Sequence, residues 1–235
     1  MNHVLQMTPL PTVAVLIATL PSSPWLLQAS LDSLEASLLK YDNGSPRQLI
    51  TVWIYMGEED KEKLGSLCTG FRVELVTGSL PRGNVVAMWN LLAKEAMKED
   101  PDYLFQTGDD VHYESPGWVE KSIDELRARD NLGVAGPTDV DNPGLATMPF
   151  VSSRHYRIFN FFFHPEFTNW FCDSWVTDIY GGRCKMEAFR CTNWQGGAKS
   201  APRYAKAFPP ESRRVELNDW GKAVVQQARQ QGMVL

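Results

Sequence analysis

The sequence predicts an α/β protein with a mainly parallel central sheet flanked by helices. Strand and helix patterns alternate through the first half of the chain, which is typical of parallel sheets covered by helices. The stretch 13–18 is a continuous apolar run, as expected of a strand buried on both faces. With 235 residues, 43% hydrophobic and 22% charged, the composition is close to the globular average. We therefore expect one domain over residues 1–235.

The later elements follow from local patterns in chain order. Ser23-Pro24 begins a helix with leucines at helical spacing, and 42–46 is a turn. Beyond Pro137 the pattern becomes aromatic and β-prone over 150–163, then mostly irregular over 187–210. The other predicted elements are strands at 49–55, 71–76, 103–106 and 133–136, a short charged helix between the second and third strands, a helix after Asn84, a helix capped by Ser115-Pro116, and a last helix with Leu217, Trp220, Val224 and Ala228.

The charges of the chain are unevenly distributed. The net charge of −5 argues against a general nucleic-acid or anionic-membrane binder. Residues 181–214 contain eight basic and two acidic side chains, a net +6, so the rest of the chain carries −11. A local basic region on an acidic protein fits a small anionic ligand, although charge alone is equally consistent with a solvated loop.

Membrane, export and disulfide signals are weak. No apolar run approaches the roughly 18 residues of a membrane span, and the run 13–20 lacks a basic region before it, so we expect a cytoplasmic protein without a signal peptide. The four cysteines form no CxxC pair and indicate reduced thiols, with a Cys184–Cys191 disulfide as the less favoured alternative.

Two adjacent acids, Asp109 and Asp110, directly follow the predicted strand 103–106. In open α/β sheets, ligands bind outside the carboxyl ends of the strands, so this pair faces the expected site. Carboxylate oxygens suit Mg²⁺ or Mn²⁺, and such ions complete their shell with phosphate oxygens. Acid pairs are common in solvated turns, but the position after a buried strand favours a binding role.

A second set of acids lies among aromatic residues between 164 and 178. Burial against aromatic rings raises the pKa of a carboxyl group and adapts it to general-base catalysis, and aromatic faces suit sugar rings. For Asp173 we favour catalysis over a role at a helix start, whereas Glu166 and Asp178 are interpreted as structural. His112 is placed near the acid pair, where a surface role is more common, and His155 and His164 are candidates to contact acceptor or phosphate.

The sequence resembles the GT-A class of nucleotide-sugar glycosyltransferases over most of its length, and most closely the small inverting enzymes found as domains in large-virus and bacterial glycan-building proteins. The resemblance rests on the opening strand 13–19, on Arg82-Gly83-Asn84 with Asn90 in the following helix, on Gly108-Asp109-Asp110-Val111, and on the stretch 169–175.

The resemblance implies a site and a reaction. Residues 12–136 would form the nucleotide-sugar-binding half, and residues 137–235 would bind the acceptor. Asp110 would be the metal ligand, with Asp109 as its partner, for Mn²⁺ or Mg²⁺. Asp173 would be the general base of an inverting sugar transfer to a glycan hydroxyl, with UDP preferred on family frequency. Thr19, Arg82, Asp109, Asp110, Lys199 and Arg203 are the predicted donor contacts.

The sequence departs from the family motif at one position. Gly108 stands where the family motif has its first acid. The alternative function that this departure suggests is a glycan- or nucleotide-binding module derived from such an enzyme. A related nucleotidyltransferase is less favoured because a glycine-rich basic loop does not follow the first strand. P-loop, G-x-G-x-x-G and G-x-S-x-G motifs do not occur in the sequence. The stretch 195–210 is predicted to order over the donor, with Lys199, Arg203 and Lys206 meeting its diphosphate.

Overall fold

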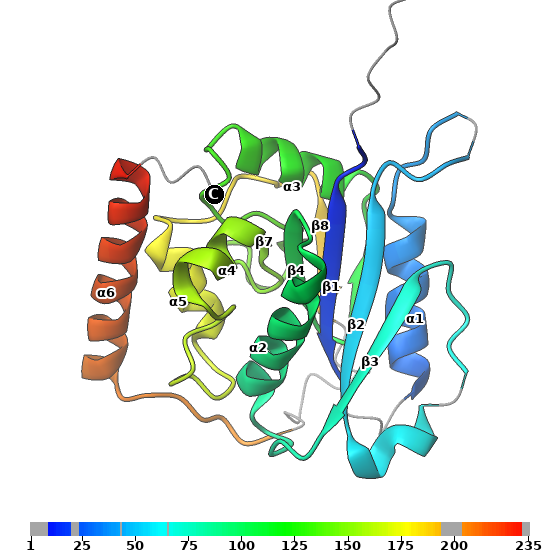
Figure 1. Ribbon diagram of the computed structural model, residues 1–235, viewed down its shortest axis with the longest axis horizontal. Helices are drawn as coiled ribbons and strands as arrows, with labels where there is room; N and C mark the ends of the chain where they lie inside the picture. Colours follow the sequence, from blue (N-terminus) through cyan, green and yellow to red (C-terminus); the bar gives the residue numbers. More distant parts are fainter. Residues whose placement is uncertain (1–8, 20–23, 43, 65, 194–203, 232–235) are drawn as a thin grey trace, which may run out of the picture.

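The computed structural model describes residues 9–19, 24–42, 44–64, 66–193 and 204–231. A five-stranded sheet has the order β3-β2-β1-β4-β7, in which the first four are parallel and β7 is antiparallel. This confirms the predicted mainly parallel α/β architecture (Figure 1). The strands are β1 (Thr12–Ala18), β2 (Leu49–Gly57), β3 (Arg72–Gly78), β4 (Tyr103–Thr107) and β7 (Phe150–Ser152).

A second, three-stranded sheet lies beyond the end of β4. In it β8 (Arg190–Asn193) pairs antiparallel with β5 (Val111–Tyr113) and parallel with β6 (Thr138–Asp139). This sheet continues directly from the acid pair, because β5 begins at Val111. The prediction of irregular chain from 187 was therefore wrong at β8, whose four residues become a strand only through distant partners.

Helices cover both faces of the main sheet. Alternate residues of β1 point to opposite sides, so Val13 and Val15 join the core under α1 and α3, whereas Ala14 and Leu16 join the core under α2, α5 and α6. The helical elements are α1 (Pro24–Ala36), η1 (Glu58–Lys63), α2 (Val85–Ala96), η2 (Met97–Glu99), α3 (Trp118–Arg127), α4 (Ser153–Phe159), α5 (Cys172–Ile179) and α6 (Glu211–Gln230).

Three predicted elements differ from the structure. The stretch 133–136 is no strand: it makes one isolated antiparallel bridge, from Ala135 to Phe150, and the fifth strand of the sheet is β7. Only 150–152 of the aromatic stretch is extended, because α4 begins at Ser153. The helix predicted at Ser115-Pro116 begins at Trp118 after Gly117, which has a positive φ of 83°, and Ser115 instead accepts a hydrogen bond from the backbone N–H of Arg190.

The last helix packs through three of the four predicted residues, because Val224 also contacts the core. Leu217 and Ala228 are buried as expected, but Trp220 is exposed, and Gly221 and Val225 complete the packed face. A side chain at Gly221 would place its Cβ 2.5 Å from Cγ2 of Ile179. The glycine therefore allows the backbone of α6 to approach α5 closely.

Candidate functional site

The carboxyl ends of β1 and β4 bring Thr19 and Asp109 together. Ile17 is the partner of Thr107 in the parallel register, so two residues further along the chain Thr19 and Asp109 are level. The Thr19 hydroxyl donates a 2.7 Å hydrogen bond to Oδ2 of Asp109, and both side chains are buried. Two residues of the predicted donor site are thus in direct contact at the edge where α/β sheets bind ligands.

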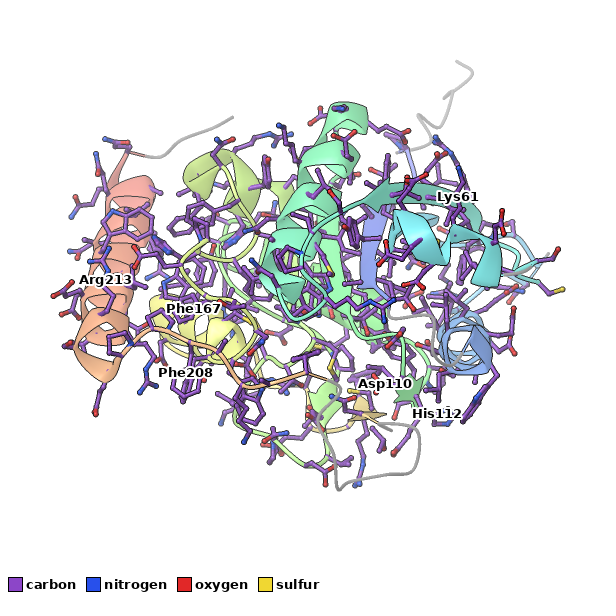
Figure 2. The ribbon with its side chains drawn as sticks, turned by 90° about the horizontal axis from the view of Figure 1, so that it is seen from below. Lys61, Asp110, His112, Phe167, Phe208 and Arg213 are labelled. Atoms are coloured by element: carbon purple, nitrogen blue, oxygen red, sulfur yellow. The ribbon has the colours of Figure 1, made fainter. Side chains whose placement is uncertain are left out.

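Asp110 lies beside this pair and occupies the space over Gly108. The side chain of Asp110 is 6% exposed and that of Asp109 2%. A Cβ at Gly108 would lie 2.8 Å from Oδ1 of Asp110, so any side chain there would displace the Asp110 carboxylate. The glycine at position 108 therefore leaves the space that the Asp110 carboxylate occupies. Figure 2 looks onto this edge and labels Asp110.

The two carboxylates fit a divalent cation in their chemistry. Mg²⁺ and Mn²⁺ are bound through one or two carboxylates together with phosphate oxygens, and Asp109 and Asp110 provide such a donor set. Within the described ranges, no cluster of three or more acidic, histidine or cysteine side chains is arranged to hold a metal. His112 is exposed on β5, opposite in direction to the buried Val111 and Tyr113, so the surface interpretation holds for it.

Arg82 is held at the same edge by an acid that sequence reasoning missed. Its Nη2 lies 2.8 Å from Oδ2 of Asp60, in η1 after β2, and 3.7 Å from Oε1 of Glu59. Asp60 is buried, whereas the Arg82 side chain is 61% exposed. The contact anchors one end of a guanidinium that remains open to solvent. The position of Asp60 after a strand was a usable signal, because carboxyl ends of neighbouring parallel strands share one edge.

Lys199 and Arg203, the remaining predicted donor contacts, lie outside the described residues, as does most of the predicted closing segment. Its described end, residues 204–210, runs without regular secondary structure into α6.

Asp173 is in the first turn of α5, so it has the helix-start position that was the alternative to a catalytic role. Its Oδ1 accepts a 2.8 Å hydrogen bond from the adjacent N–H of Ser174, and the helix has no side-chain N-cap. Burial raises the pKa of Asp173, hydrogen bonds from the Ser174 N–H oppose this, and the negative charge of Asp139 raises it further. A carboxyl group of this kind is adapted to accept a proton above the usual pH range of an aspartate.

Asp139 is a second strand-end acid that the sequence prediction missed. It ends β6 and is fully buried, and its carboxylate accepts hydrogen bonds from the Asp141 N–H, the Asn142 amide and the Thr147 hydroxyl. The loop that it organises is fastened to α5, because Ala146 N–H donates to the Thr177 hydroxyl. Sequence reasoning missed it because a two-residue strand leaves no periodic pattern.

Asn169 connects Gly83, in the turn before α2, to the chain that precedes α6. Its Nδ2 donates to the carbonyls of Gly83, at 2.8 Å, and Ala205, at 3.1 Å. Its Oδ1 accepts a hydrogen bond from the Ala207 N–H at 2.9 Å. The stretch 205–207 is thereby fixed against the start of α5 and against the residue next to Arg82.

The aromatic stretch before α5 is mainly structural. The prediction that His155 contacts a ligand is wrong: its ring nitrogens are bonded to the Tyr180 hydroxyl and the Phe162 carbonyl, both at 2.8 Å, and burial lowers its pKa to about 4. His164 is half-buried among aromatic rings, and its Nδ1 accepts from Glu166 N–H. Asn90 likewise binds backbone, at Phe162 and Phe163.

The two acids interpreted as structural make surface contacts. Glu166 accepts two hydrogen bonds from Arg213, at 2.6 and 2.8 Å. Asp178 accepts one from Asn218 at 3.0 Å. All four cysteines are free thiols; Cys172, Cys184 and Cys191 are buried and Cys68 is exposed.

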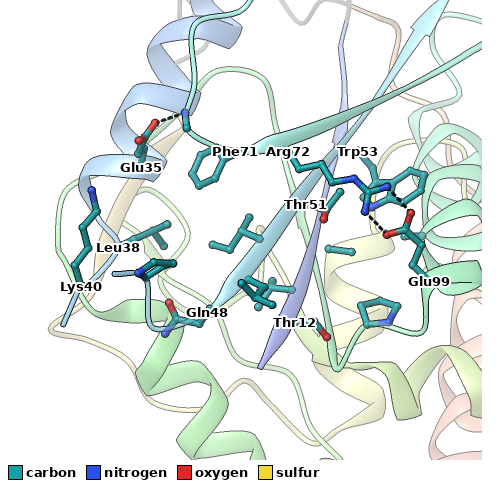
Figure 3. A pocket seen from close by; sticks show the side chains of 18 of the residues that line it. Thr12, Glu35, Leu38, Lys40, Gln48, Thr51, Trp53, Phe71, Arg72 and Glu99 are labelled. Carbon is teal, nitrogen blue, oxygen red and sulfur yellow. Dashed lines mark hydrogen bonds and ion pairs between the residues drawn. The ribbon is translucent and has the colours of Figure 1, made fainter. Parts of the chain in front are cut away.

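A cavity of about 540 Å³ lies at the opposite edge of the sheet (Figure 3). Its lining includes Thr12, Leu49 and Arg72, the first residues of β1, β2 and β3. Arg72 there forms a two-bond contact with Glu99. The cavity therefore faces the amino ends of the strands, away from the acid pair.

Comparison with known structures identifies the fold. The chain matches Staphylococcus aureus TarS residues 1–349 in complex with UDP at a TM-score of 0.57 and 11% identity, covering 92% of this chain and 69% of that one. It matches a mannosyltransferase from Pyrobaculum calidifontis in complex with GDP-Man and Mn²⁺ at a TM-score of 0.54 and 12% identity, covering 94% and 74%. The fold is GT-A-like.

The GT-A-like fold agrees with the resemblance found in the sequence. In another TarS 1–349 structure, with a TM-score of 0.54 and 10% identity, the match covers 77% of this chain but only 60% of that chain. No protein-family model and no curated protein sequence matches the chain. Within the part of the chain that the structure describes, none of the helices has the length and apolar character required to cross a bilayer.

Proposed function

We propose that this protein is a glycosyltransferase that transfers a sugar from a nucleotide-diphosphate donor, with UDP as the preferred nucleotide, to a hydroxyl of a glycan. The observation that carries the proposal is the contact between Thr19 and Asp109, beside Asp110, at the carboxyl edge of a GT-A-like sheet. Neighbours of this fold in complex with UDP or with GDP-Man and Mn²⁺ support it.

Asp110 is the proposed metal ligand and Asp109 its partner. When bound, Mn²⁺ or Mg²⁺ would supply positive charge to the leaving diphosphate. Thr19 orients Asp109 by donating a hydrogen bond to its Oδ2. Arg82, which is anchored by Asp60 and keeps an exposed guanidinium, remains a proposed donor contact at this edge. Lys199 and Arg203 remain proposed donor contacts.

Asp173 is the proposed general base of an inverting reaction. Inversion requires a carboxylate on the acceptor side that takes the hydroxyl proton while the new glycosidic bond forms and the diphosphate leaves. The raised pKa of Asp173 supports this role, because a stronger base accepts the proton more readily. Of the aromatic residues that precede it, Trp170 is exposed and offers apolar surface for the acceptor sugar.

Two variants test these assignments. Asp110→Ala is expected to weaken calorimetric binding of UDP with Mn²⁺ by at least tenfold, about the effect of one lost charged ligand contact. The matched control is Asp141→Ala, which removes an acid from the loop after β6. Unchanged binding by Asp110→Ala would remove this residue from the metal site.

Asp173→Asn is expected to lower turnover about 10²–10⁴-fold while leaving UDP affinity unchanged. Asp178→Asn, five residues later on the same helix, is the control and is expected to retain turnover. Near-normal turnover by Asp173→Asn would refute the general base, and a product with the donor's anomeric configuration would refute inversion.

A further inference from the structure

Exposed aromatic rings and cations gather where the chain before α6 passes the start of α5. This cation–aromatic patch consists of Trp170, Phe171, Lys206, Phe208 and Arg214. Trp170 is 39% exposed and Phe208 44%, which is high for large aromatic side chains. In Figure 2, the segment that carries Phe208 crosses the molecule from α6 toward the side where Asp110 lies.

The cations of the patch are held by rings and not by acids. Nζ of Lys206 lies 3.7 Å from the centre of the Trp170 ring, and the Arg214 guanidinium lies 3.8 Å from that of Phe171. Among the described residues, no carboxylate lies within ion-pair distance of Lys206 or Arg214. Nε of Arg214 is buried and makes no hydrogen bond to any described residue. Neither cation is therefore paired with a carboxylate of the described residues, so an anionic ligand would meet no competing acid at these two side chains.

Arg213 provides a contrast within the same region. Its guanidinium binds Glu166 and Glu216, at 2.6 Å in each case, and these bonds raise its pKa. Its charge is thus matched by two acids, whereas those of its neighbour Arg214 and of Lys206 are not. The two adjacent arginines therefore differ, because Arg213 is paired with acids and Arg214 packs against aromatic rings.

An open hollow of about 710 Å³ adjoins the patch, and its lining includes Lys206, Phe208, Pro210, Glu166 and Arg213. The hollow is large enough for a sugar unit. Phe171 directly precedes α5, whose first turn carries Asp173. The hydrogen bonds of Asn169 fix 205–207, and with it Lys206, against this helix start. Aromatic surface, unmatched cations and the proposed base are thus joined in one local structure.

We propose that the cation–aromatic patch binds an anionic sugar, so that the glycan acceptor carries phosphate or carboxylate groups. The patch supplies a ring face for the C–H surface of the sugar and cations for its charge. The assignment of this ligand as the acceptor rests on the proposed function. The binding of an anionic sugar does not, because it requires neither donor nor turnover.

The test is nuclear magnetic resonance titration of the ¹⁵N-labelled full chain, without nucleotide or metal. The indole N–H of Trp170, assigned with Trp170→Phe, reports on the patch. Glucose 6-phosphate and glucuronate are the charged probes, and glucose and inorganic phosphate are the controls for sugar alone and anion alone. We expect both charged sugars to shift the signal at concentrations where glucose and phosphate do not. A stronger response to one of them identifies the charged group.

Variants locate the binding. Lys206→Gln and Arg214→Gln are each expected to weaken binding of the charged sugars about fivefold, as for one exposed ion contact. Lys222→Gln removes an exposed lysine from another part of α6 and is expected to have no effect. Binding should also weaken with salt, because about 0.1 M salt screens exposed charges beyond roughly 10 Å.

Three results would overturn the proposal: no shift with either charged sugar, equal shifts with glucose or phosphate, or unchanged affinity in both patch variants. Absence of sugar transfer by the intact protein would instead contradict the proposed function. It would not affect the conclusion that the patch binds an anionic sugar.

Discussion

The buried His155 predicts that acid selectively destabilises this fold. Its imidazole is enclosed by Phe159, Phe162 and Tyr180, and burial lowers its pKa from 6.5 to about 4. Below pH 6.5 the unfolded chain therefore binds a proton that the folded chain does not, so the free energy of unfolding falls as the pH falls toward 4. The stability that His155 contributes is fully present above pH 6.5.

The expected magnitude follows from the difference between the two pKa values. The difference between a pKa of 6.5 in the unfolded chain and about 4 in the folded chain corresponds to about 3 kcal/mol of unfolding free energy, since one pKa unit is about 1.4 kcal/mol. Between pH 7 and pH 5, where the unfolded chain titrates and the folded chain barely does, the loss is about 2 kcal/mol.

Urea unfolding followed by tryptophan fluorescence at pH 7 and pH 5 measures this loss. Other groups contribute too, so the comparison is with His155→Gln, whose amide can replace the bonds to Tyr180 and Phe162. We expect the loss of unfolding free energy between pH 7 and pH 5 to be about 2 kcal/mol smaller in this variant than in the wild type. His112→Gln, which removes an exposed imidazole, is the control.

An equal pH dependence in wild type and His155→Gln would refute the reasoning. If the variant does not fold, titration of the His155 ring by nuclear magnetic resonance replaces it, and a pKa near 6.5 would be the contradicting result.

Two further predictions concern the electrostatics of Asp173 and the packing of α6 against α5. Asp139→Asn removes a negative charge that raises the pKa of Asp173, so the acidic limb of the turnover–pH profile should move to lower pH, and an unmoved limb would show that the two carboxylates do not interact. Gly221→Ala should lower the free energy of unfolding by about 1–3 kcal/mol, because its Cβ would overlap Ile179; Lys222→Ala is the control, and a Tm equal to wild type would contradict the close approach of α5 and α6.

The parallel core of the fold could be predicted because its signals are local. The apolar run of β1 and the leucine spacing of α1 depend on residues close in sequence, and the structure confirms both. β8 and β6 could not be predicted, because a strand of two to four residues exists only where a distant partner pairs with it. The stretch 133–136 was mistaken for a strand because its small apolar residues are buried without pairing along a ladder.

In the candidate site, too, some residues could be predicted from the sequence and others could not. Thr19 and Asp109 could be expected to meet, because both follow strands that end at the same edge of a parallel sheet. Asp60 and Asp139 were missed, since one follows its strand in a charged 3₁₀ turn and the other ends a strand too short to predict. His155 was misjudged because the sequence does not reveal that its two ring nitrogens find partners in the core.

The most direct test of the proposed function is release of nucleoside diphosphate from a panel of nucleotide sugars with Mn²⁺ and no acceptor. Water can replace the acceptor hydroxyl in a glycosyltransferase site, so slow hydrolysis of at least one donor is expected, with a large reduction in Asp110→Ala. Hydrolysis should be weaker without Mn²⁺. Tight binding of a donor with no hydrolysis would indicate a nucleotide-binding module, and absence of both binding and hydrolysis across the panel would contradict the account.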